Sequence, residues 1–233
     1  MKISLFGITA ITPGKHLIKD PRLDQADKLA EAQKKTYAQV DIADEKEIST
    51  ADSILTSRAA FSDLLMKDIE FIETRLSRGA NDEEKVVLTK LAEALISEKP
   101  VSAAGLAAAE LAVISAHNFC SNKPVVVAEE SDLSNTAGLL VRAFKESGYF
   151  AFLTVGGKEN RAWPIRSGMT AWEAAGTIHT DIQKGFIRAE IISFADFVEA
   201  GGETQAKRAG KQRLELKSYV MQDFDVANFR FNK

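Results

Sequence analysis

The stretch MTAWEAAGTIHTDIQKGFIRAEIISF, residues 169–194, decides the fold of the last third of the chain. Its first half, residues 169–179, predicts a short helix, and residues 185–194 predict a long strand rich in β-branched and aromatic side chains. Residues 151–168 before it predict a hairpin, and residues 219–231 after it predict a closing pair of strands. The last third is therefore expected to be a small sheet that packs on a helix.

The order of these elements also predicts a domain boundary. Two strands, a helix, a third strand and two closing strands follow the order of a ubiquitin-like β-grasp fold, with a helical excursion around two glycines at residues 197–210. After Gly148 the predicted elements change from mainly helices to mainly strands. We therefore expect one domain over residues 1–148 and a β-grasp domain over residues 149–233.

The first domain is expected to be an α/β domain with a helical insertion. Strands are predicted at residues 2–8, 36–44 and 123–130, with a helix after Pro21. Between about residues 59 and 118 the apolar positions recur at helical spacing, and a short polar turn near Gly79 separates two amphipathic stripes. This pattern predicts an antiparallel helical hairpin, or helical arm, with Asn81 or Asp82 as the N-cap of its second helix.

Composition narrows the class of protein. The chain has 233 residues, 45% hydrophobic and 27% charged, which is typical of a soluble globular protein. One cysteine and three scattered histidines disfavour a disulfide framework or a tightly held metal. With no apolar run long enough to cross a bilayer and no signal peptide, we expect a cytoplasmic protein without membrane partners.

The opening KISLFGITAITPGKH, residues 2–16, raises the question of a nucleotide site. A phosphate-binding P-loop has four residues between its glycines and a hydroxyl residue after its lysine. Here six residues separate Gly7 from Gly14, Pro13 has no N–H, and His16 follows Lys15. We therefore expect Gly14, Lys15 and Asp41 to be at most weak nucleotide-binding candidates, with Lys15 in a solvated loop.

Residues 150–233 contain four distinctive motifs: the AAG-IHTD run, the GFIRAE strand, the AGK-R-E-K-YV stretch and the terminal FRF. In these motifs the region closely resembles the C-terminal TGS domain of YchF-type, Obg-related P-loop NTPases. Five upstream segments resemble parts of that family in the same order along the chain. KISLFG resembles its first strand, DPRLD the segment that leads to its second switch, and VDIAD its Walker-B strand. DIEFIETRL resembles its helical arm, and KPVVVAEE its base-recognition strand. The chain resembles a shortened member of this lineage.

Three departures from the family fall on the catalytic machinery that the resemblance implies. The P-loop is incomplete, Asp44 stands where the D-x-x-G glycine would be, and residues 128–130 lack the asparagine that recognises the base. Phosphoryl transfer depends on positioning and charge neutralisation, so each loss is expected to cost on the order of a few kcal/mol. We therefore expect no cofactor, no catalytic residue and no enzymatic activity.

The basic residues of the C-terminal domain are the expected partner-binding set. Clustered Lys and Arg bind RNA phosphates through a salt-dependent term. The resemblance implies RNA or ribosome contact through this set: Lys184, Arg188, Lys207, Arg208, Lys211, Arg213 and Lys217. Interspersed glutamates leave an ordinary solvated surface as the other interpretation. Net charge of −3 gives no indication of DNA binding.

Three functions follow as hypotheses. The first is a non-hydrolysing binding or regulatory protein that acts through its TGS domain on RNA, the ribosome or a protein. The second is a GTP- or ATP-binding protein, with magnesium and slow NTPase activity, that uses an unconventional loop around Gly14 and Lys15. The third is a structural protein that self-associates or binds a protein through the helical arm.

Overall fold

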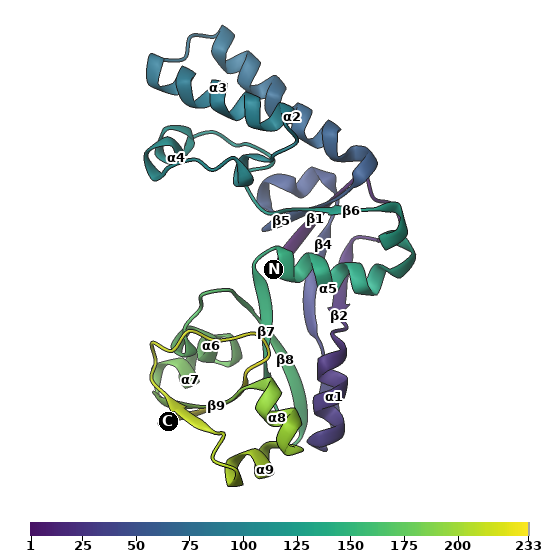
Figure 1. Ribbon diagram of the computed structural model, residues 1–233, viewed down its shortest axis with the longest axis vertical. Helices are drawn as coiled ribbons and strands as arrows, with labels where there is room; N and C mark the ends of the chain where they lie inside the picture. The colour runs from purple at the N-terminus through teal and green to yellow at the C-terminus, as the bar shows by residue number, and fades with distance from the viewer. Residues whose placement is uncertain (233) are drawn as a thin grey trace. The chain divides into compact units, whose positions relative to one another are not determined.

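The computed structural model describes residues 1–232 and contains two compact units. Unit 1 comprises residues 1–16 and 40–139, and unit 2 comprises residues 17–39 and the chain from residue 140 onward. The sequence led us to expect one boundary near residue 149. In the structure the segment 17–39 lies with unit 2, so the chain leaves unit 1 and returns to it (Figure 1).

A sheet with a parallel centre forms the base of unit 1. The strand order is β2-β4-β1-β5-β6, and β1 pairs in parallel with both β4 and β5, while β5 pairs in parallel with β6. The bounds are β1 Lys2–Phe6, β2 Gly14–Ile18, β4 Ala38–Ala43, β5 Ser53–Ser57 and β6 Val125–Ala128. A strand that is covered on both faces consists of consecutive apolar residues. In β5 the neighbouring residues Ile54 and Leu55 are both fully buried.

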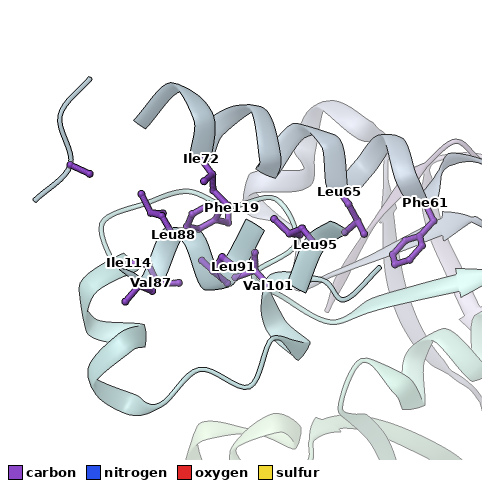
Figure 2. Close-up of a cluster of buried hydrophobic side chains, with 11 residues drawn as sticks. Phe61, Leu65, Ile72, Val87, Leu88, Leu91, Leu95, Val101, Ile114 and Phe119 are labelled. Atoms are coloured by element: carbon purple, nitrogen blue, oxygen red, sulfur yellow. The ribbon is translucent and has the colours of Figure 1, made fainter. Parts of the chain in front are cut away.

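Two long helices extend from this sheet and share a core. Helix α2 spans Arg58–Ser77 and α3 spans Asp82–Ile96, and Figure 1 shows them side by side. Asn81 caps α3 through a 2.9 Å hydrogen bond from the Glu84 N–H, as the sequence predicted. Figure 2 shows the side chains of both helices meeting those of the following segment, where the short helix α4 covers Ala108–Ile114. Burial of these stripes holds the helices together.

The described part of unit 1 also contains three 3₁₀ turns, and one further helix begins in unit 1 and continues into unit 2. The turns are η1 Glu45–Thr50, η2 Val101–Ala103 and η3 Glu130–Asn135, and α5 spans Thr136–Glu146. Lys123 donates from its Nζ to the carbonyls of Ile48 and Ala51 at 2.6 and 2.8 Å, which fixes the end of η1 beside the strand β6. The structure thus anchors the segment that follows β4.

Unit 2 contains a six-stranded sheet in the order β10-β9-β11-β7-β8-β3. Strands β7 and β8 form the predicted hairpin, and β9 pairs antiparallel with β10 and β11. The bounds are β3 Lys34–Thr36, β7 Tyr149–Thr154, β8 Glu159–Arg166, β9 Phe186–Ile192, β10 Arg213–Glu215 and β11 Val226–Phe231. Alanines of the predicted helix, among them Ala171 and Ala175, pack against one face of this sheet.

Several short helices accompany this sheet within residues 17–39 and 171–208. They are α1 Pro21–Leu29, α6 Ala171–Ile178, α7 Thr180–Lys184, α8 Phe194–Ala200 and α9 Glu203–Arg208. Pro21 occupies the first turn of α1, and Thr170 and Glu173 form a capping box at α6. Both helices begin at residues whose chemistry favours a helix start.

One predicted strand of the closing pair is wrong. Residues 219–224 form no strand beyond an isolated bridge from Val220 to Thr170, and the strand beside β9 is β10 instead. The physical reason is a tight turn around the buried carboxylate of Asp225, which accepts hydrogen bonds from the Gln222 N–H and the Tyr219 hydroxyl, both at 2.9 Å. That turn bends the chain away from an extended conformation.

Candidate functional site

A hollow of about 460 Å³ lies at the carboxyl edge of the unit 1 sheet. Because β1 and β4 are parallel, their carboxyl ends meet at one edge, which is where open α/β sheets bind ligands. The hollow is lined by the end of β1, the loop after it and the two residues after β4, namely Leu5, Gly7, Ile8, Thr9, Ile11, Thr12, Pro13, Asp44 and Glu45. All of these residues belong to unit 1.

The loop of residues 7–13 is held by its apolar side chains and leaves its amides free. Ile8 and Ile11 are 7% and 4% exposed, so they anchor the loop. None of the N–H groups of residues 8–12 donates a hydrogen bond to any residue that the structure describes. Unpaired amides in a short loop after a strand are the donors that cradle phosphates. The loop therefore offers anion-binding donors although it departs from the P-loop pattern.

Gly7 sets the close approach between this loop and helix α2. Its φ is +63°, and a Cβ there would stand 2.2 Å from the Cβ of Ala60. Ser57, the N-cap of α2, accepts the Ala60 N–H at 3.2 Å beside this glycine. The 20-residue helix α2 thus begins next to the hollow, with the positive end of its dipole at that edge of the sheet.

Two carboxylates border the hollow. Asp44 caps η1 by accepting the Lys46 N–H at 2.9 Å, and the Asp44 carbonyl accepts the Ser4 hydroxyl at 2.8 Å. Glu45 pairs with Lys67 at 3.1 Å. Two acidic side chains beside unpaired amides would repel a bare phosphate. They suit one that arrives with a divalent cation, since Mg²⁺ is held by one or two carboxylates together with phosphate oxygens.

The three weak nucleotide candidates lie outside this hollow. Gly14 and Lys15 begin strand β2, so Lys15 is an exposed strand residue and the expectation of a loop at this position is wrong. Asp41 is exposed on β4 opposite Lys2, the first residue of β1, and so stands toward the other end of that strand. The sequence reasoning missed the free amides of residues 8–12, whose only signal was a glycine after a buried strand.

The basic set of unit 2 divides into paired and unpaired members. Lys207 pairs with Glu203 at 2.7 Å, Lys211 with Asp196 at 2.9 Å and Arg213 with Glu215 at 3.2 Å. The remaining four form no ion pair within residues 1–232: Lys184, Arg188, Arg208 and Lys217. A partner can contact these four cations without breaking an existing ion pair.

Two other groups that invite a catalytic interpretation have structural roles. His179 caps α7 by accepting the Asp181 N–H on its Nδ1 at 3.1 Å, which occupies the ring nitrogen nearest Asp181. Burial, followed by the nearby Asp68 carboxylate, raises the pKa of the Cys120 thiol, so this cysteine is a poor nucleophile. Within residues 1–232 no group of three or more acidic, histidine or cysteine side chains is arranged to hold a metal ion. Among the described helices, none has the length and apolar character of a membrane span.

Comparisons with known proteins agree on one family. Residues 149–232 match the family YchF-GTPase_C, described as "Protein of unknown function (DUF933)". "Ribosome-binding ATPase YchF" of Bacillus subtilis is 30% identical over 235 residues, which covers 73% of this chain and 64% of that protein. The protein of the same name from Haemophilus influenzae is 57% identical over 81 residues, covering 35% of this chain and 22% of the relative. The chain thus spans less than two thirds of the length of these curated relatives.

A solved structure shares the fold over nearly the whole chain. "Structure of the Schizosaccharomyces pombe YchF GTPase" superposes with a TM-score of 0.76 at 18% sequence identity, covering 99% of this chain and 97% of that one. The resemblance drawn from the sequence is therefore confirmed, as is an α/β fold with two sheets. The prediction that the chain is not an enzyme is contradicted, because the matched proteins are named as ATPases and as a GTPase.

The physical reason is that the donors that bind phosphate can be backbone N–H groups as well as side chains. Three departures from the P-loop pattern were counted as losses of all nucleotide chemistry, whereas the edge of the sheet still carries a hollow, free amides and two carboxylates. Motif matching registers the missing lysine but not the backbone donors, which every residue type except proline carries.

Proposed function

We propose, because this chain belongs to the YchF family, that it is a ribosome-binding protein that takes ATP or GTP at the carboxyl edge of the unit 1 sheet and hydrolyses it slowly. The observation that carries the proposal is the coincidence of two findings. Similarity to a ribosome-binding ATPase extends over 73% of the chain, and a hollow with unpaired amides lies where α/β sheets bind nucleotides.

The chain's own groups suggest how the triphosphate is held. The N–H groups of residues 8–12 and the hydroxyls of Thr9 and Thr12 are the available phosphate donors in the hollow. Asp44 and Glu45 are the groups suited to the accompanying magnesium ion. Magnesium would screen the phosphate charge from both carboxylates, so binding is expected to require it.

Slow turnover follows from the same list of groups. No lysine or arginine is among the residues that line the hollow within the described chain. Electrostatic stabilisation of the transferred phosphoryl group by a fixed cation is worth about 10³–10⁵ in rate where it has been removed or added. Backbone amides and a bound metal ion alone therefore support binding better than rapid hydrolysis.

Unit 2 is the proposed ribosome-binding part. We assign it as a TGS-type β-grasp domain, since its sheet packs on α6 and its sequence carries the family match over residues 149–232. The helices α2 and α3 are assigned as the inserted helical arm, which offers a second surface for a protein partner. Two functions on two units are consistent with relatives named as ribosome-binding ATPases.

The test is a titration of fluorescent ATP and GTP analogues with and without magnesium, followed by a single-turnover hydrolysis assay. Asp44→Asn is the informative variant, because an asparagine still caps η1 but carries no charge for magnesium. Asp41→Asn is the matched control, because Asp41 lies on the preceding strand β4 and away from the hollow. We expect magnesium-dependent binding that weakens in the first variant only. Absence of binding by either nucleotide in the unaltered chain would refute the nucleotide part.

The ribosome part has its own measurement. Co-sedimentation of the full chain with purified ribosomes across a salt series should show binding that falls as salt rises. A chain that stays in the supernatant at every salt concentration would contradict ribosome binding while leaving the nucleotide result intact.

A further inference from the structure

One face of the unit 2 sheet is polar where β9 and β11 pair. The register sets Arg188 opposite Arg230 and Glu190 opposite Asn228. Because opposite residues and residues two apart share a face, these four side chains point to the same side. The other side holds the apolar residues Ala189, Ile191, Ala227 and Phe229, which pack with the alanines of α6.

The two arginines form a like-charge pair across the ladder. Side chains directly opposite in an antiparallel pair have Cβ atoms about 4.5–5.5 Å apart, and like charges there destabilise the sheet. Arg230 is held by the carboxylate of Glu190, which is 6% exposed and also accepts the Asn228 amide at 3.0 Å. Arg188 is exposed and has no partner among the described residues. The carboxylate of Glu190 therefore neutralises Arg230 alone, and the two arginines with Glu190 keep a net positive charge.

The other charges near this face leave the positive charge uncompensated. Glu215 of β10 lies opposite Ala189 and therefore on the other side of the sheet. Glu203 of α9 pairs with Lys207. Lys184, just before β9, is a further cation that forms no ion pair among the described residues. The acidic side chain on α9 is thus already neutralised, while Arg188 and Lys184 have no acidic partner.

We propose that the Arg188–Arg230 pair, in which Glu190 holds Arg230, binds phosphates of the RNA backbone. This inference rests on the proposed ribosome binding and specifies that ribosomal RNA, through this face, is the contact. Two guanidinium groups side by side present N–H donors that match phosphate oxygens, and a phosphate between them removes their mutual repulsion. The two arginines would contact phosphates and not the edges of bases, so we expect the binding to be independent of the RNA sequence.

The test uses a fluorescein-labelled single-stranded RNA of roughly 12 nucleotides, a length within the range of small sheet-based domains. Anisotropy titrations of the full chain compare Arg188→Gln with Arg208→Gln. Both arginines are exposed and form no ion pair among the described residues, but Arg208 ends helix α9 and is not part of the β9–β11 ladder. We expect Arg188→Gln to weaken binding about tenfold at moderate salt and to reduce the salt slope by about 0.7, the value of one phosphate contact to a single strand. Arg208→Gln should change affinity less than twofold, and Arg188→Lys should retain part of the binding.

Each other outcome overturns the inference in a recognisable way. Equal weakening by both glutamine variants would indicate a diffuse basic surface. Ribosome co-sedimentation that is unaffected by Arg188→Gln would place the contact on a protein or on another face, and the proposed function would stand. Failure of the unaltered chain to sediment with ribosomes would instead refute the ribosome-binding part of the proposed function. Because Arg188 has no structural partner among the described residues, loss of the fold does not confuse the comparison.

Discussion

The guanidinium carbon of Arg22 lies 3.7 Å from the centroid of the Phe224 ring. Arg22 also donates to Asp223 at 2.8 Å and to Asp20, the N-cap of its own helix. Desolvation lowers the pKa of Arg22, but the bonds to both aspartates outweigh it, and the pKa lies above its ordinary value. Through these contacts helix α1, near the start of the chain, packs against a turn near the end of the chain, and both belong to unit 2.

Phe224 makes this contact from a strained backbone. Its φ is +63°, its ring is 2% exposed, and Phe194 packs edge-on at 5.4 Å between centroids. We expect Phe224→Ala to lower the free energy of unfolding by about 3–5 kcal/mol, because it removes a buried ring and leaves the strain. The free energy of unfolding of Phe224→Gly should be higher than that of Phe224→Ala by about 1 kcal/mol, because glycine adopts this φ freely. Urea unfolding measures whether stability falls from the natural chain to Phe224→Gly and then to Phe224→Ala. A glycine variant more stable than the natural chain would contradict this order.

Gly7 is expected to be required for two separable reasons. Gly7→Ala adds a Cβ at 2.2 Å from the Ala60 Cβ, whereas Gly79→Ala, also at positive φ, meets nothing within 4 Å. The Gly79 variant should cost about 1 kcal/mol of stability from φ alone. Gly7→Ala should cost about 1–3 kcal/mol more, as overpacking does. Adding Ala60→Gly should recover that excess, and thermal unfolding of the four proteins checks it. Equal costs at both glycines would contradict the clash.

The loss of folding stability at acidic pH is expected to depend on Glu84. Hydrogen bonds from Arg75 at 2.6 and 2.8 Å, and from His117 at 2.7 Å, lower the pKa of Glu84 to about 2 against the opposing effect of burial. A lowered folded-state pKa contributes stability above the ordinary carboxyl value of about 4.5 and loses it as pH falls toward about 2. Melting temperatures of the natural chain and Glu84→Gln should therefore differ at pH 7 and converge across that interval. A difference that is constant between pH 7 and pH 2 would contradict the assignment.

Asp68 is expected to be the strongest polar determinant of the helical arm. Its buried carboxylate accepts the N–H of Cys120 at 2.6 Å, and the N–H and hydroxyl of Ser121 at 2.8 and 2.6 Å. Asp68→Asn replaces an acceptor by an amide donor that faces donors, and should cost about 1.5–3 kcal/mol. Asp63→Asn, exposed on the same helix, should change stability by less than 0.5 kcal/mol, as roughly expected of a surface site. Chemical denaturation compares the two, and equal effects would refute this role.

Local chemistry in the sequence was sufficient for many elements. Pro21 at a helix start, Asn81 as an N-cap and the run at residues 185–194 each predicted the element that the structure contains at that place. The motifs of residues 150–233 were enough to identify the family that the comparisons found. These predictions succeed because capping, proline geometry and hydrophobic period act within a few residues of the chain.

Long-range arrangement escaped the sequence reasoning. Nothing local indicated that residues 17–39 would join unit 2, where Asn160 donates to the Asp27 carboxylate at 2.8 Å and Arg22 covers Phe224. Residues 219–224, predicted as a strand, form a turn around a buried aspartate. The candidate site was misjudged for the same reason, because backbone amides carry no residue-type signal.

The amino-acid sequence by itself determined the helices, most strands and the family, since these depend on side-chain period, caps and motifs that are read along the chain. Only the tertiary structure decided that the free amides of residues 8–12 border a hollow with Asp44, and that Arg188 stands opposite Arg230. Both juxtapositions join residues far apart in the sequence through sheet register. Register is fixed by the packing of whole strands, and no short stretch of residues encodes it.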